Sequence, residues 1–153
     1  MKKIISVSQA STPIDIALLI ARVGIGALML THGLPKMAML FSGQPLQFPP
    51  MMGMSAAMSL SLTVFAEVIC SVLLLTGLVT RLAAIPLIIT MLVALILVHA
   101  ADPVAKQEPA LHYLLVYVVL LFAGSGKYSL DYLLGGKRIA TGNTRKTDAA
   151  FAV

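Results

Sequence analysis

Four long apolar stretches constrain this chain more than any other feature of its sequence. They run over residues 14–34, 56–79, 82–101 and 110–126. A helix of about 20 apolar residues crosses the ~30 Å hydrocarbon core of a bilayer. Because 59% of the residues are hydrophobic and only 11% are charged, the chain lacks the polar surface that a soluble domain of this size needs. We therefore predict an all-α integral membrane protein.

The fourth stretch is short enough to be a re-entrant segment, so the positions of the basic residues decide the topology. If all four stretches span, most of the Lys and Arg residues outside them lie on one side, and only Lys36 and Lys106 face the other. Three spans would place the basic C-terminal residues outside, against the positive-inside rule. We predict a multi-pass four-helix bundle in a bacterial inner membrane with both termini in the cytoplasm. The residues on the cytoplasmic side would be Lys2, Lys3, Arg81, Lys127, Lys137, Arg138, Arg145 and Lys146.

The bundle is predicted to form one domain over residues 1–134, and residues 135–153 are predicted to form a polar, basic, disordered cytoplasmic tail. The connection from Pro35 to Ser55 is rich in Pro, Gly and Met. We expect it to end the first helix, to allow at most a short helix over residues 36–41, and to form a long outer loop. The turn between the second and third helices is only Thr80-Arg81, which makes those helices antiparallel neighbours. Gln107-Glu108-Pro109 is expected to open the fourth helix.

Two function classes are disfavoured by the sequence. The basic residues gather at the chain ends rather than along one face, so nucleic acid is not a predicted partner. Cys70 is the one cysteine in the chain, which excludes an internal disulfide or a dithiol redox pair.

Two charged residues fall inside predicted spans. Arg22 lies near the middle of the first and Glu67 near the middle of the second. An ionisable group in hydrocarbon costs at least a few kcal/mol, so each needs a partner or a function. We predict that Arg22 and Glu67 contact each other at the membrane midplane, either as a lock between helices or as part of a binding site. Gly26 and Gly33 continue the face of Arg22 and leave room for a ligand or a neighbouring helix.

The three histidines share a predicted depth. His32, His99 and His112 each lie at the outer end of a different span, with Lys36 just above. They could form one polar site with the midplane charges below and the outer loop above, or they could be separate interfacial residues. A haem or metal site is a third interpretation, but nothing in the sequence fixes the directions of the side chains. We assign no metal.

Methionine is concentrated around the first connection, at Met29, Met37, Met39, Met51, Met52, Met54 and Met58. Thioethers are soft ligands that can hold Cu(I). The favoured interpretation is that these side chains are flexible apolar filler, since no tight Met-x-Met repeat is present.

Several short motifs, in this order and spacing, resemble the DoxX family of small bacterial membrane proteins. They are the segment around Arg22, the run Thr31-His32-Gly33-Leu34-Pro35-Lys36, the run Phe65-Ala66-Glu67-Val68, Arg81 after the second span, and Gly124-Ser125-Gly126-Lys127-Tyr128-Ser129-Leu130-Asp131. The resemblance covers roughly residues 15–134 and implies a four-helix membrane bundle. Some family members resemble a subunit of a quinone-linked oxidoreductase and others a component of a redox-defence complex. The cysteines of redox-active relatives are missing here.

We therefore predict a small subunit or accessory factor of a membrane redox system that binds a quinone or a similar small molecule in a polar intramembrane cavity. Enzyme activity is left open; if present, it would be that of a quinone-linked oxidoreductase subunit, and the sequence identifies no catalytic residue. The alternatives are a scaffold or assembly factor and, less favoured, a small-solute transporter. Expected partners are the lipid bilayer, a redox protein and a second copy of the chain. The candidate ligand contacts are Arg22, Glu67 and His99, followed by His32, His112 and Lys36.

Overall fold

The computed structural model describes residues 12–134, and every regular element in that part of the chain is helical. The tail predicted over residues 135–153 lies outside the described residues. In chain order the elements are α1 (Thr12–Phe41), α2 (Ala56–Val64), the π-helical segment η1 (Phe65–Cys70), α3 (Ser71–Thr76), α4 (Thr80–Val93), the π-helical segment η2 (Ala94–Val98) and α5 (Val104–Ala123). The prediction of an all-α membrane bundle is confirmed.

Three uninterrupted helical segments within residues 12–134 are long and apolar enough to cross a bilayer. They are Thr12–Phe41, Ala56–Thr76, which joins α2, η1 and α3 and is called the second span below, and Thr80–Val98, which joins α4 and η2. The 20-residue α5 is not among them; its first turns carry Lys106, Gln107 and Glu108. That α5 is a fourth span with both chain ends in the cytoplasm remains a prediction.

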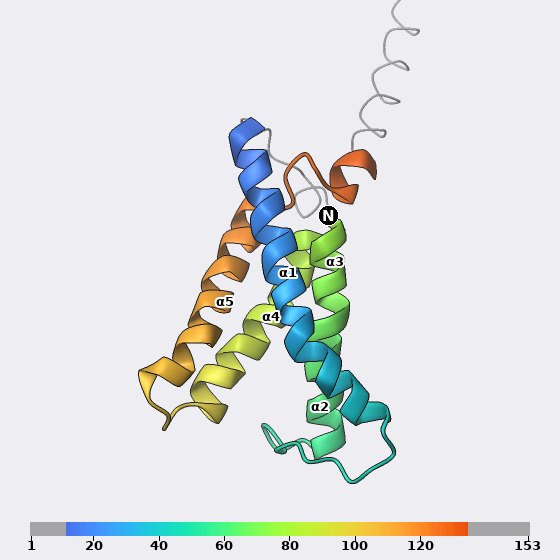
Figure 1. The fold of residues 1–153 in the computed structure, drawn as a ribbon, viewed down its shortest axis with the longest axis vertical. Coiled ribbons are helices and arrows are strands. Elements are labelled where there is room, and N and C mark those ends of the chain that lie inside the picture. Colours follow the sequence, from blue (N-terminus) through green and yellow to red (C-terminus); the bar gives the residue numbers. More distant parts are fainter. Residues whose placement is uncertain (1–11, 135–153) are drawn as a thin grey trace, which may run out of the picture.

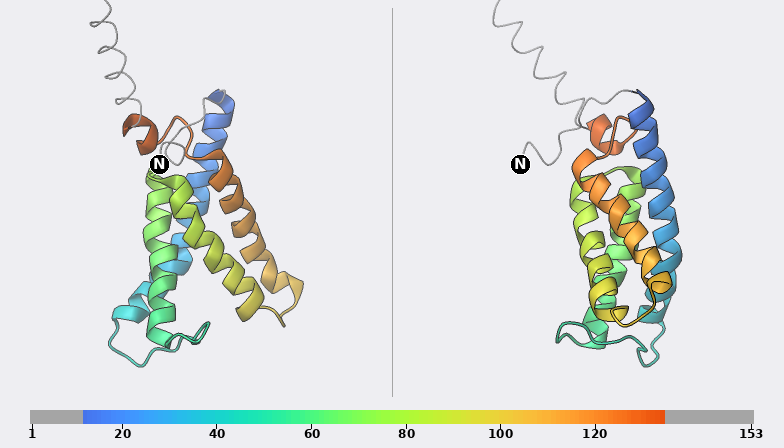
Figure 2. Two further views of the ribbon diagram at one scale, coloured as in Figure 1. Left: turned by 180° about the vertical axis from the view of Figure 1, so that it is seen from behind. Right: turned by 90° about the vertical axis from the view of Figure 1, so that its left-hand side faces the viewer.

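The helices form two antiparallel pairs. α1 packs against the second span, and α4 packs against α5. The two pairs lie close together at the end that carries the turn between α3 and α4, and they diverge toward the opposite end (Figures 1 and 2). The segment after α5 folds over the closed end, where residues 130–134 begin another helical turn. We call the closed end, with the turn and this segment, the turn end of the bundle.

The first helix is longer, and the first connection shorter, than the sequence predicts. The prediction that Pro35 ends the first helix is wrong, because α1 continues through Pro35 to Phe41. Proline lacks the N–H that would bond to the carbonyl four residues earlier, so the helix loses one bond at Thr31 without ending. The non-helical part of the connection therefore covers only residues 42–55. It packs against the second span: Leu46 and Phe48 contact the cluster around Leu60.

The methionines near this connection include apolar packing residues. Met37 and Met39 pack against Leu60, Val64 and Val68 of the second span. Flexible thioethers fill irregular apolar gaps well, so these two contacts support the filler interpretation over a copper site.

Two other helix boundaries differ from the prediction. The turn between α3 and α4 lies at Gly77–Val79, and Thr80 and Arg81 already belong to α4. Gly77 has φ +68°, the left-handed conformation that glycine adopts without a Cβ clash. α5 begins at Val104 rather than at Pro109, so Pro109 lies inside the helix. The prediction that Pro109 opens this helix is wrong.

Candidate functional site

A polar cavity of about 160 Å³ lies in the angle between the two helix pairs. Each wall departs from regular α geometry there: α1 contains Pro35, the second span contains η1, the third contains η2, and α5 contains Pro109. π-Helical turns inside α-helices occur frequently at functional sites. The cavity is lined by Met29, His32, Lys36, Glu67, Met91, Ala94, His99, Lys106, Pro109, Ala110 and Tyr113.

The charged centre of the cavity is an ion pair between α1 and η1. Lys36 Nζ lies 2.5 Å from Glu67 Oε1. The Glu67 side chain is almost fully buried, whereas about a third of Lys36 is exposed, so the ammonium group lies between the carboxylate and the surface. Gly33 makes this pairing possible, because a Cβ at that position would lie 3.0 Å from Glu67 Cβ and 2.9 Å from Val68 Cγ2. The space left by Gly33 is thus occupied by the neighbouring helix.

His99 lies on the other side of the cavity, directly after η2. Its Nδ1 lies 2.7 Å from Asp102 Oδ2, and Gln107 Nε2 donates to the His99 carbonyl at 2.9 Å. A histidine whose Nδ1–H is donated to a carboxylate has Nε2 left for a ligand or water. The hydrogen bond from His99 holds the pKa of Asp102 below its ordinary value.

The other two histidines have different environments. His32 lines the cavity, and its ring meets Tyr113 edge to face with 5.8 Å between centroids. Tyr113 in turn stacks on the fully buried Tyr117, with centroids 6.1 Å apart. His112 is exposed and does not line the cavity. The structure therefore brings two of the three predicted histidines to one cavity.

One oxygen of the buried carboxylate has no partner. Glu67 Oε2 is inaccessible to solvent and accepts no hydrogen bond from any described residue. An unsatisfied buried polar atom in a folded protein calls for an explanation such as a water molecule, an ion or a ligand. Its position on a residue that lines the cavity makes it the most informative atom of the site.

The predicted contact between Arg22 and Glu67 is wrong. Arg22 donates from Nη1 to the Ser125 carbonyl at 3.1 Å and from Nη2 to the Tyr128 carbonyl at 2.6 Å. A Cβ added to Gly77 would collide with the Arg22 guanidinium, which places that group at the turn end of the bundle. Gly77 follows Glu67 by ten residues, or ~15 Å along a helix. The predicted span over residues 14–34 has its middle near Arg22, but α1 runs from Thr12 to Phe41, so Arg22 lies nearer to the start of the helix than to its middle.

Arg22 belongs to a buried polar cluster at the turn end. The Asp131 carboxylate accepts hydrogen bonds from Val79 N at 2.8 Å and from Thr80 N at 3.3 Å, and thereby caps the first turn of α4. Asp15 accepts from Lys127 N at 3.0 Å, with Lys127 Nζ 3.4 Å from its other oxygen. These bonds connect α1, the turn before α4 and the segment after α5. We assign this cluster a structural role.

Sequence reasoning missed several residues of the two polar regions. Asp102 and Tyr113 contact candidate histidines, and Asp15 and Asp131 hold the turn end together. A signal for Asp102 was present, because an acidic residue three positions after a histidine can bond to its ring across a turn. Asp131 belongs to the motif after the last helix, but its partner at Val79 lies 52 residues away, and spacing alone does not reveal that.

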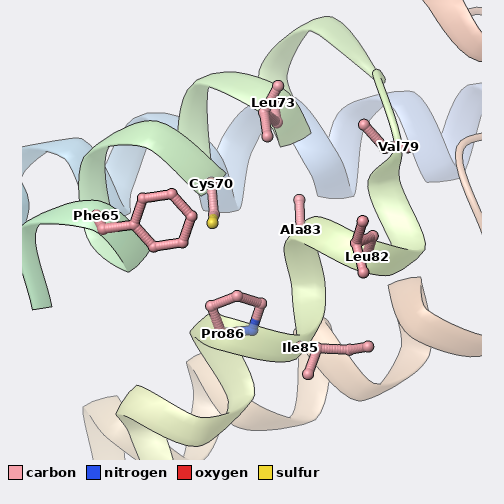
Figure 3. A pocket seen from close by; sticks show the side chains of 8 residues that line it. All are labelled: Phe65, Cys70, Leu73, Val79, Leu82, Ala83, Ile85 and Pro86. Carbon is pink, nitrogen blue, oxygen red and sulfur yellow. The ribbon is translucent and has the colours of Figure 1, made fainter. Parts of the chain in front are cut away.

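A second cavity, larger at about 300 Å³, is apolar. It lies between the second span and α4 and is lined by Phe65, Cys70, Leu73, Val79, Leu82, Ala83, Ile85 and Pro86 (Figure 3). Cys70 presents its sulfur on this cavity, and no charged side chain lines it. Since specific binding needs a few placed polar groups, the smaller polar cavity is the better candidate site.

Comparison with known proteins identifies a relative and a family for this chain. The chain is 30% identical over 135 residues to an uncharacterized membrane protein of Mycobacterium tuberculosis (strain ATCC 25618 / H37Rv), an alignment that covers 79% of this chain and 83% of the relative. No solved structure matches the chain. The DoxX family model matches residues 17–100, more than half of the chain, including Arg22, the Lys36–Glu67 pair and His99. The chain belongs to the DoxX family of membrane proteins.

Proposed function

We propose that this DoxX protein binds the head group of a small lipid-soluble molecule of the quinone class in the cavity around Lys36 and Glu67. In this role it would serve as a small subunit or accessory factor of a redox system in the bacterial inner membrane. A redox protein, and a second copy of the chain, would be its partners in that membrane. The observation that carries the proposal is the buried Glu67 carboxylate, which has an unsatisfied oxygen and lines a cavity together with Lys36 and His99.

The size and composition of the cavity favour a head group over a whole ligand. Drug-sized ligands occupy pockets of roughly 300–1,000 Å³, and this cavity measures about 160 Å³. Met29, Met91 and Ala94 give it apolar walls, while Lys36 and His99 offer polar contacts. A flat ring with oxygen substituents matches that combination, and its hydrocarbon tail would remain among the lipid-facing helices.

The proposed site differs from the predicted set of ligand contacts. Glu67, His99, His32 and Lys36 are kept because they share one cavity. Arg22 is reassigned to the structural cluster because both terminal nitrogens of its guanidinium group, Nη1 and Nη2, bond to backbone carbonyls. His112 is dropped because it lies outside the cavity.

The test is to purify the full chain in native lipid discs, identify co-purifying small molecules by native mass spectrometry, and measure binding of short-tailed quinone analogues. We expect a retained quinone-class molecule, and we expect Glu67→Gln to bind it more weakly while the helical circular dichroism is unchanged. The matched control is Glu108→Gln, which removes an exposed carboxylate at the start of α5. If the parent protein neither retains nor binds such a molecule, the proposal fails and the scaffold alternative replaces it.

A further inference from the structure

The unsatisfied Glu67 oxygen restricts what a ligand can present to the cavity. An ionised carboxylate only accepts hydrogen bonds. Lys36 donates to Oε1, and Oε2 accepts nothing from the described residues. The group missing from the site is therefore a hydrogen-bond donor. A ligand that carries only carbonyl oxygens would place two acceptors against each other.

The charges around the cavity argue against a cationic donor. Two lysines, Lys36 and Lys106, belong to the lining. Each carboxylate beside them already has a lysine partner, because Lys36 pairs with Glu67 and Lys106 Nζ lies 3.6 Å from Asp102. A ligand ammonium group would therefore meet two cations and no carboxylate without a cationic partner. A neutral O–H group satisfies Oε2 without adding charge to a partly buried site.

The rest of the lining suits an aromatic alcohol. Methionine sulfur packs favourably at the edges of aromatic rings, and Met29 and Met91 both line the cavity together with the Tyr113 ring. On the opposite wall, His99 Nδ1 is taken by Asp102. The remaining Nε2 can accept from a hydroxyl when the ring is neutral or donate to an oxygen when it is protonated.

We propose that Glu67 Oε2 accepts a hydrogen bond from a ligand hydroxyl, which makes the cavity selective for a quinol or another phenol over the corresponding quinone or ether. This inference rests on the proposed function, because it assigns the oxidation state of the ligand that the cavity prefers. Lys36 donates to Oε1 in this arrangement, and Oε2 accepts no hydrogen bond from a described side chain.

The experiment compares two matched pairs of probes on the full chain in lipid discs under anaerobic conditions. The first pair is duroquinol and duroquinone. The second pair is 2,3,5-trimethylphenol and its methyl ether, which are not interconverted by oxidation or reduction. A hydrogen bond to a charged acceptor corresponds to an affinity ratio of about 10- to 100-fold. We expect the hydroxyl-bearing member of each pair to bind more tightly by that ratio.

Substitutions test whether Glu67 causes the preference for the hydroxyl-bearing probe. Glu67→Gln keeps the shape of the side chain but replaces the charged acceptor with a neutral amide, so we expect the ratio to fall to about threefold or less. Lys36→Met combined with Glu67→Gln tests the same change without an unpaired lysine, in case the single variant folds poorly. Glu108→Gln should keep the ratio of the parent protein.

The outcomes separate the two proposals. Equal binding of phenol and ether, tighter binding of the ether, or an unchanged preference in Glu67→Gln would overturn the donor selectivity and leave the binding site standing. If no member of either pair binds the parent protein, the proposed function itself is overturned. A preference that disappears in Glu67→Gln and persists in Glu108→Gln supports the inference.

Discussion

Lys36 and Glu67 form an ion pair across two helices, with Lys36 Nζ 2.5 Å from Glu67 Oε1 although 31 residues separate them in the sequence. Gly33 lets the helices approach closely enough for this contact. The consequence is that the two intramembrane charges found in the sequence serve different regions. Glu67 belongs to the polar cavity, and Arg22 belongs to the cluster at the turn end.

Removing the lysine should destabilise the fold through the carboxylate that it leaves behind. We expect Lys36→Met to lower the free energy of unfolding by about 1–3 kcal/mol, which is below the ~3–5 kcal/mol of a fully buried pair because part of the Lys36 side chain is exposed. The double variant Lys36→Met with Glu67→Gln should recover most of that loss. Unfolding in mixed detergent micelles measures each value.

A second double-mutant cycle tests whether the two charged regions are energetically independent. Arg22→Leu combined with Lys36→Met should be additive within about 0.5 kcal/mol, as expected for residues that share no partner. A larger coupling energy would show that Arg22 and the cavity pair form one network after all.

Gly33 should tolerate no side chain. Gly33→Ala would place a Cβ 3.0 Å from the Glu67 backbone carbon and 2.9 Å from Val68 Cγ2, so we expect a loss of about 1–3 kcal/mol from overpacking. Gly24→Ala is the matched control on the same helix, because a Cβ there meets nothing within 4 Å. The control should be neutral or slightly stabilising. Equal losses in both variants would indicate a general effect of replacing glycine in α1.

The helices were predictable from the sequence because a membrane span requires a long apolar run with few charged residues, and both properties can be read within a single segment. Each of the three segments long and apolar enough to cross a bilayer begins and ends within seven residues of the corresponding predicted span. The largest difference is at the end of the first span, because α1 continues past Pro35 to Phe41. A proline signals the loss of one backbone bond, but whether a helix ends there depends on packing beyond it. Here Met37 and Met39 pack against the second span and hold the last turns of α1 in place.

The site was only partly predictable, because the position of a residue along a helix does not determine the direction in which its side chain points. The sequence predicts the three histidines at one end of the bundle, but which of them line the cavity depends on helix rotation and on the π-helical turn η2 before His99. Arg22 was paired by opposite charge, although its partners are the Ser125 and Tyr128 carbonyls. Every residue has a backbone carbonyl, so the sequence does not show which carbonyls will accept a hydrogen bond from a distant side chain.

Asp131 should stabilise the fold by capping α4. Asp131→Ala removes the acceptor for Val79 N and Thr80 N, and loss of a helix cap costs about 0.5–2 kcal/mol. Asp131→Asn keeps one acceptor oxygen and should lose less. Thermal unfolding of the two variants in the same detergent ranks them. If Asn is as damaging as Ala, the charge of Asp131 matters more than its hydrogen bonds.

The contact between His99 and Asp102 should weaken in acid. The hydrogen bond from His99 lowers the pKa of Asp102 from its ordinary value of 3.8. A carboxylate with a depressed pKa stabilises the folded state above its unfolded pKa, and that stabilisation is lost as the pH falls through the folded value. We therefore expect the His99 ring resonances to report loss of this contact below about pH 4. Asp102→Asn should remove that transition, and a transition that survives in Asp102→Asn would assign it to another group.

Tyr117 offers a test of the buried interior behind the cavity. Its side chain is fully buried, and its hydroxyl has no hydrogen-bond partner among the described residues. A buried hydroxyl without a partner costs about 1–3 kcal/mol, so Tyr117→Phe should leave the free energy of unfolding unchanged or raise it by up to that amount. The stacking on Tyr113 is kept, because phenylalanine preserves the ring. Tyr113→Phe is the control at the cavity wall and should change ligand affinity more than stability. If Tyr117→Phe instead destabilises the protein by 1 kcal/mol or more, roughly the value of one hydrogen bond, the hydroxyl holds an internal water molecule and the polar region extends from Glu67 into the core.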